Sequence, residues 1–146
     1  MRYEQLFIGQ MMISMGLLTL IWIIQILHYP IFKYIDDELF PQAMEMHQKK
    51  ISFVVVPMMI LEAILSTMMA FIGSYMDIII LMLVIGIWTC TFLIQVPLHK
   101  KLLLKKNYLH IDHLVRTNWI RTFLWSIKFI FLGQQFIKLN NLHDGF

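Results

Sequence analysis

Four long apolar stretches dominate the chain, at residues 6–32, 51–72, 78–98 and 119–137. A helix needs about 20 mainly apolar residues to cross the hydrocarbon core of a bilayer. Because no water satisfies the backbone there, only helices and closed barrels cross it. Barrel strands alternate apolar and polar residues, and these stretches do not. The pattern predicts an all-α integral membrane protein, with one domain over residues 1–146 folded as an antiparallel four-helix bundle.

The composition excludes several classes of protein. Of the 146 residues, 59% are hydrophobic and 14% are charged, whereas about 25% are charged in ordinary soluble domains. The single cysteine, Cys90, rules out a disulfide within the chain. Motifs for a phosphate-binding loop or an activated serine are missing from the sequence. The net charge is +3, but the basic residues flank apolar stretches, so they indicate contact with the lipid bilayer and no nucleic acid.

The basic residues also predict an orientation. They gather in the two long connections, after the first and third stretches, whereas the hairpin at 73–77 has none. By the positive-inside rule, both long connections face the cytoplasm and both termini lie on the outer side. Pro41 suits the first turn of the second helix, where its missing N–H is not needed. The basic residues of the connections are Lys33, Lys49, Lys50, Lys100, Lys101, Lys105, Lys106 and Arg116.

The first and third stretches end alike. His28-Tyr29-Pro30 closes one and Gln95-Val96-Pro97 closes the other, 67 residues later. This spacing suggests one helical hairpin used twice in the same orientation, as in parallel repeats of membrane proteins. Chance likeness is the alternative, since identity elsewhere between the halves is low.

Two opposite charges lie near the middle of apolar stretches. Glu62 interrupts the second and Lys128 the fourth. A central charge costs about 2.5–3.5 kcal/mol on insertion scales. The same depth and opposite sign predict an ion pair between the two helices, facing the interior. One interpretation is a structural pair that sets helix register; the other is a proton or substrate site.

The fourth stretch places four polar or aromatic residues on one face. Asn118, Arg121, Trp125 and Lys128 are spaced by three, four and three residues, which aligns them on a helix. Arg121 would lie about 10 Å from Lys128 and has no acidic partner at its depth. Helix-end carbonyls, the Gln95 side chain, an anionic ligand or snorkelling to the interface are the candidate explanations.

Further candidates gather at the predicted cytoplasmic end. Trp88, Gln95 and His99 share a helix face by steps of seven and four, and buried tryptophans pack a core or line an aromatic pocket. Histidines on facing helices of a bundle bind haem or a transition metal. The alternative is that the histidines cap helix ends or face solvent. The candidate metal ligands are His28, His47, His99 and His113.

Four segments of the chain are distinctive: HYPIF (28–32), PMMILE (57–62), WTCTFLIQVPLH (88–99) and LVRTNWIRTFLW (114–125). Through these segments the chain resembles a family of small bacterial four-helix membrane proteins of unknown function. More distantly, it is similar to anthrone-oxygenase-like membrane proteins through the end of its first stretch and Arg121. The first resemblance implies a bacterial inner membrane, and the second implies oxidation of an aromatic substrate.

These observations predict a membrane-embedded redox protein or oxygenase-like enzyme. It would bind haem, a transition metal or an aromatic or quinone-like molecule at the cytoplasmic end. One alternative is a transporter or channel subunit, acting as a homo-oligomer through the Glu62–Lys128 pair; another is a non-catalytic assembly factor. The predicted catalytic residues are His28, His99, Arg121, Glu62 and Lys128, and the predicted ligand-binding residues are Gln95, Asn118, Trp88, Trp125 and Tyr29.

Overall fold

Every regular element in residues 2–143 is helical, as the sequence predicts. The computed structural model describes these residues, with side chains for residues 2–141. Four long helical stretches follow one another along the chain, and two of them contain a π-helical segment. In order, the elements are α1 (Tyr3–Ile23), η1 (Ile24–His28), α2 (Tyr29–Ile31), η2 (Phe32–Tyr34), α3 (Phe40–Ile72), α4 (Tyr75–Cys90), η3 (Thr91–Gln95), α5 (Val96–Leu104) and α6 (Tyr108–His143).

Three of the four helical stretches are long and apolar enough to cross a membrane. They are Tyr3–Tyr34, Phe40–Ile72 and Tyr75–Leu104, and each is longer than the apolar stretch from which it was predicted. The predicted start of the second helix is confirmed, because Pro41 lies in the first turn of α3. Helix α6 falls outside this group of three. Arg121, Lys128 and several side-chain amides interrupt its apolar sequence.

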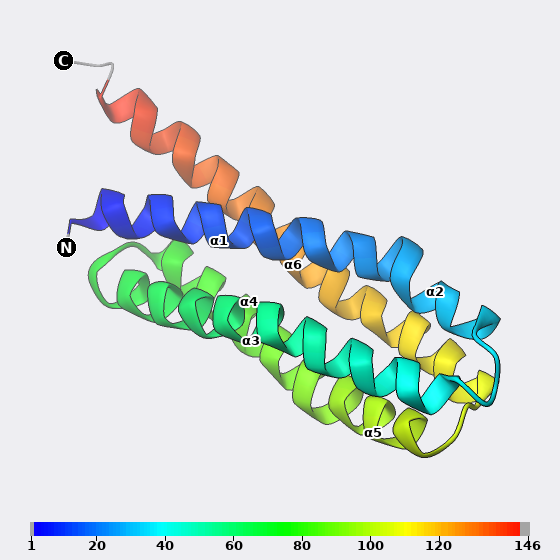
Figure 1. Cartoon of the computed structure of the whole chain (residues 1–146). Coiled ribbons are helices and arrows are strands. Elements are labelled where there is room, and N and C mark those ends of the chain that lie inside the picture. The colour runs from blue at the N-terminus through cyan, green and yellow to red at the C-terminus, as the bar shows by residue number, and fades with distance from the viewer. Residues whose placement is uncertain (1, 144–146) are drawn as a thin grey trace.

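The four stretches lie side by side and alternate in direction (Figure 1). The chain enters α1 and leaves α6 at one end, and the connections before α3 and α6 lie at the other. We call the end of the molecule that carries these two connections the connection end. Helix α1 packs against α3 and α6, and α4 packs against the same two helices. The interior is therefore enclosed by α1, α3, α4 and α6 in that order, with α3 and α6 on one diagonal.

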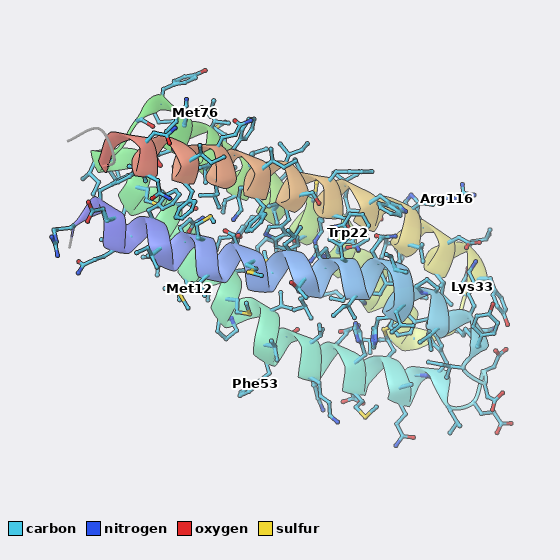
Figure 2. The ribbon with its side chains drawn as sticks, turned by 90° about the horizontal axis from the view of Figure 1, so that it is seen from above. Met12, Trp22, Lys33, Phe53, Met76 and Arg116 are labelled. Atoms are coloured by element: carbon cyan, nitrogen blue, oxygen red, sulfur yellow. The ribbon has the colours of Figure 1, made fainter. Side chains whose placement is uncertain are left out.

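Apolar side chains cover the outside, while many of the polar ones are buried. Met12 and Phe53, which are 70% and 83% exposed, point away from neighbouring helices (Figure 2). Lipid tails are as apolar as leucine, so such a surface suits a bilayer and gives no drive for helices to associate. The helices must therefore be held together by close packing and by interhelical hydrogen bonds. Three clusters of buried apolar side chains, which include Leu6, Ile87 and Ile111 respectively, supply the packing.

Each π-helical segment lies just before a proline. Segment η1 ends two residues before Pro30, and η3 ends two residues before Pro97. Proline lacks an N–H and clashes with the carbonyl four residues earlier, and a local π-turn relieves that clash within a continuing helix. The segments are related by the offset of 67 seen in the sequence, from Ile24 to Thr91 and from His28 to Gln95. The repeat therefore has a structural counterpart in the helix geometry.

Lys106 joins the two connections at the connection end. It donates a hydrogen bond to the Ile35 carbonyl at 2.5 Å and pairs with Asp37 at 3.0 Å. Its charge also lies 4.8 Å from the centre of the Tyr108 ring. The hydrogen bond to Asp37 raises the pKa of Lys106. This lysine therefore stays protonated and holds the α2–α3 connection against the start of α6.

The opposite end is closed by a two-residue turn between α3 and α4, which Asp77 of α4 holds in place. The turn consists of Gly73 and Ser74, and the Ser74 backbone donates to the Asp77 carboxylate at 2.6 Å. Tyr3 and Gln135 donate to the same carboxylate at 2.8 and 3.2 Å. Asp77 is fully buried. It therefore caps α4 and also ties α1 and α6 to that helix.

Replacing Gly73 with alanine is expected to destabilise this end by about 1–3 kcal/mol. A Cβ atom at Gly73 would lie 2.7 Å from the Met69 carbonyl oxygen and would also collide with the Asp77 carboxylate. Unfolding of the detergent-solubilised protein by sodium dodecyl sulfate, followed by circular dichroism, measures the loss. Gly133→Ala is the control, because a Cβ there meets nothing within 4 Å. Equal stability of the two variants would contradict the packing described for the turn.

Candidate functional site

The predicted ion pair is confirmed, and it crosses the centre of the molecule. Lys128 on α6 pairs with Glu62 on α3, the helix diagonally opposite, and both side chains are fully buried. Lys128 also donates to the Ser14 hydroxyl at 2.8 Å, and the Trp125 N–H donates to Glu62 at 3.1 Å. Charge and hydrogen-bonding capacity are thus satisfied within the protein, which favours the structural interpretation of the pair.

The predicted polar face of α6 is confirmed as an interior face. Asn118, Arg121, Trp125 and Lys128 are all buried. Asn118 donates to the Gln25 side chain at 2.8 Å, and Gln25 in turn donates to the Val115 carbonyl at 3.2 Å. This amide pair fastens η1 to α6. Asn118, Gln25 and Trp125 do not line the pocket that the next paragraph describes.

A pocket of about 290 Å³ lies beside this face, towards the connection end. We call it the Arg121 pocket. Its walls come from all four helical stretches and are mainly apolar, with the polar residues at a few points. Both Gln95, at the end of η3, and Tyr29, directly after η1, line it. The lining residues are Ile24, Tyr29, Gln48, Ile51, Ser52, Val55, Val56, Met59, Trp88, Thr91, Phe92, Gln95, Val96, His99, Lys100 and Arg121.

Arg121 is 6% exposed and forms no ion pair with a carboxylate of the described residues. Its guanidinium lies 5.2 Å from the centre of the Trp125 ring and interacts with the Tyr29 hydroxyl. A buried charge without an opposite charge is costly. The cation–π contact and the phenol offset part of that cost, and Arg121 also lines the Arg121 pocket.

Four side chains lining the pocket carry buried polar atoms that lack a hydrogen-bond partner within the described chain. Such atoms are uncommon in folded proteins, and each calls for an explanation. Here they include donors, an acceptor and a ring nitrogen that takes either role according to its tautomer. The atoms are Trp88 Nε1, Gln95 Oε1, His99 Nδ1 and Arg121 Nε.

Three of the four candidate histidines gather beside the pocket. His28 Nε2 lies 2.6 Å from His47 Nδ1, and the ring centres of His47 and His99 are 5.6 Å apart. His99 Nε2 lies 3.0 Å from the Tyr29 hydroxyl. The three histidines come from η1, α3 and α5, so only tertiary packing brings them together. We call these four residues, Tyr29, His99, His47 and His28, the histidine chain.

His113 does not join the other histidines. Its side chain is exposed on α6, so the predicted set of four metal ligands is not assembled. Nor do the described residues contain any group of three or more histidine, cysteine or acidic side chains arranged to hold a metal ion. The reason is geometric, because His28 and His47 are hydrogen-bonded to each other and His99 to Tyr29.

Several interior polar residues were not among the sequence-predicted site residues. Gln10 pairs with Ser66 at 2.7 Å, and Gln25 pairs with Asn118. Their signal was present in the sequence, as polar side chains within long apolar stretches. Gln48 and Ser52, which line the Arg121 pocket, carried a weaker signal, because they lie where charged residues give way to apolar ones.

Comparison of the chain with protein-family models, curated proteins and solved structures found no match. The inference of function therefore rests on the chemistry of the Arg121 pocket and of the histidine chain.

Lys128→Met is expected to destabilise the protein by about 3–5 kcal/mol, because it leaves the Glu62 carboxylate buried without its partner. Adding Glu62→Gln removes the stranded charge and keeps an acceptor for Trp125, so the double variant should recover most of the loss. Dodecyl sulfate titration of each variant gives the coupling energy of the pair. Lys138→Met, at an exposed position of α6, is the control. A loss in the double variant equal to the sum of the losses in Lys128→Met and Glu62→Gln would show that the two side chains are not coupled.

Proposed function

We propose that the chain is an integral membrane protein of four spans packed as a bundle, with α6 as the fourth span. The charges of α6 that face the interior are Arg121 and Lys128, so its outer surface can meet lipid. The connection end carries the basic residues and would face the cytoplasm of a bacterial inner membrane. Both the start of α1 and the end of α6 would then lie on the outer side (Figure 1).

The proposed function is to bind a lipid-soluble aromatic or quinone-like molecule in the Arg121 pocket. The single observation that carries it is the pocket itself, with apolar walls and four unpartnered polar atoms. Ligand sites typically combine mainly apolar walls with a few fixed polar groups. A flat, apolar molecule that bears oxygen atoms would meet both requirements.

The polar groups suit a ligand with carbonyl or phenolate oxygens. Arg121 and Trp88 present N–H donors, and Gln95 presents a carbonyl oxygen to a hydroxyl group. A hydrogen bond from a charged donor is worth about 1.5–3 kcal/mol, and a partly anionic oxygen would also neutralise Arg121. Met59, Phe92 and Val55 would pack against the ring.

The proposed chemistry at the site is proton exchange with this ligand when an external electron carrier oxidises or reduces it. Reduction of a quinone to a quinol consumes two electrons, which the carrier would supply, and two protons, which the site would supply. Tyr29 and His99 line the pocket and are hydrogen-bonded to each other, and both residue types serve as general acids and bases. This proposal keeps the redox role predicted from the sequence, and the polar groups of the Arg121 pocket support it.

Arg121→Gln is expected to weaken binding of the probe quinone menadione by at least tenfold, because it removes the charged donor. Quenching of tryptophan fluorescence in lipid nanodiscs measures the affinity, since Trp88 lines the pocket. Arg116→Gln is the matched control, because Arg116 is exposed on the same helix. Trp88→Phe should also weaken binding while it preserves the wall. Failure of the native protein to bind menadione, or equal affinity in both arginine variants, would contradict the proposal.

A further inference from the structure

Two members of the histidine chain lie away from the Arg121 pocket. Tyr29 and His99 line that pocket, whereas His28 and His47 line a second one, of about 310 Å³, between α2 and the start of α3. Exposed Lys50 also lines this second pocket, as expected where a membrane helix reaches water. The histidine chain therefore runs from the ligand pocket to the connection end.

Two links of the chain are direct hydrogen-bond contacts. The Tyr29 hydroxyl lies 3.0 Å from His99 Nε2, and His47 Nδ1 lies 2.6 Å from His28 Nε2. Both distances are within the range in which a proton can be passed between the two atoms. Each contact uses one nitrogen of each ring, so the other nitrogen remains for a further link.

The middle of the chain carries the two unused ring nitrogens. His47 Nε2 and His99 Nδ1 are both buried and lack a hydrogen-bond partner among the described residues. The two rings are tilted by 32°, and their centres lie 5.6 Å apart. Buried waters typically bridge polar atoms that are otherwise unsatisfied. One bridging water would satisfy both nitrogens and join the two halves of the chain.

We propose that Tyr29, His99, His47 and His28 form a proton path between the Arg121 pocket and water at the connection end. This inference rests on the proposed function, since the path serves a ligand in that pocket. A hydroxyl of the bound ligand gives its proton to the Tyr29 oxygen as Tyr29 gives its own to His99 Nε2. His99 then releases a proton from Nδ1 through the bridging water to His47 Nε2, His47 releases one to His28, and His28 releases one to water.

The balance of this path is one proton lost by the ligand and one gained by water, with no electron moved. Each imidazole gains a proton on one nitrogen and loses one from the other, as a neutral ring with one donor and one acceptor allows. The reverse sequence delivers protons to the ligand and restores the original tautomers. Proton supply to a reduced quinone would use this direction.

The surroundings suit a path that is insulated from other acids and bases. Phe32 packs edge-on against both His28 and His47, with ring centres 5.3 and 5.1 Å away. Among the described residues, the charged side chains that line the two pockets are cations: Arg121, which acts on His99, and Lys100 in one, and Lys50 in the other. These charges favour departure of the proton from the ligand, which leaves an anionic oxygen beside Arg121.

A pH-jump experiment on the full chain in nanodiscs tests the path. The probe is 2-hydroxy-1,4-naphthoquinone, a quinone whose neutral acid and anion absorb differently, so its spectrum reports its own protonation while it is bound. After rapid mixing, the rate of the spectral change measures proton exchange between pocket and water. We expect His47→Leu to slow this rate at least tenfold and to change probe affinity less than twofold, because His47 does not line the Arg121 pocket. Imidazole in the buffer should restore the rate.

His28→Gln is the second variant, and His113→Leu is the control because His113 is exposed on α6. His28→Gln should slow proton exchange while the probe stays bound, and His113→Leu should exchange protons at the native rate. Unchanged rates in both the His47 and His28 variants, with binding retained, would overturn the proton path and leave the proposed function intact. Failure of the native protein to bind the probe would contradict the proposed function and, with it, the proton path that depends on that function.

Discussion

The contact between Lys128 and Glu62 is the constraint on which the rest of the interior depends. Both side chains are fully buried in a molecule whose outer surface is apolar. In such surroundings a separated charge is far more costly than a paired one. The pair therefore fixes the relative height and rotation of α3 and α6, which lie on a diagonal and would otherwise share few contacts. Ser14 and Trp125 add bonds that leave the pair with a single arrangement.

The position of Arg121 follows from that arrangement. It lies seven residues before Lys128 on the same interior face, so the pair directs it inward as well. Lys128 pairs with a carboxylate, whereas Arg121 contacts an aromatic ring and a phenol and lines a pocket. The two π-helical segments beside the pocket reinforce the contrast, since π-bulges recur at functional sites. The Lys128–Glu62 pair is therefore satisfied internally, while four side chains that line the Arg121 pocket carry polar atoms without partners among the described residues.

Whether a feature of the structure could be predicted from the sequence depended on how far apart in the chain the interacting residues lie. The inner face of α6 followed from the three- and four-residue spacing of its polar residues, and the ion pair followed from charge and depth alone. The sequence placed His28 and His47 at the same end of the molecule but did not predict their direct contact, because that contact depends on how the connection folds α3 back against η1. The sequence also could not show that His113 stays apart from the other histidines. It lies at the same end of the molecule, but its side chain is exposed on α6. The hairpin at 73–77 was predicted, but the burial of Asp77 and its hydrogen bonds with Tyr3 and Gln135 were not.

The sequence by itself determined the helical class, the long apolar helices and the residues that cannot face lipid, because these depend on hydropathy and on helical periodicity along the chain. Only the tertiary structure decided which polar groups find partners. Hydrogen bonds act over about 3 Å, and a small rotation of one helix exchanges one partner for another. Packing therefore satisfied Lys128 and Gln25 and left Arg121, Gln95 and Trp88 with unpartnered atoms around a pocket.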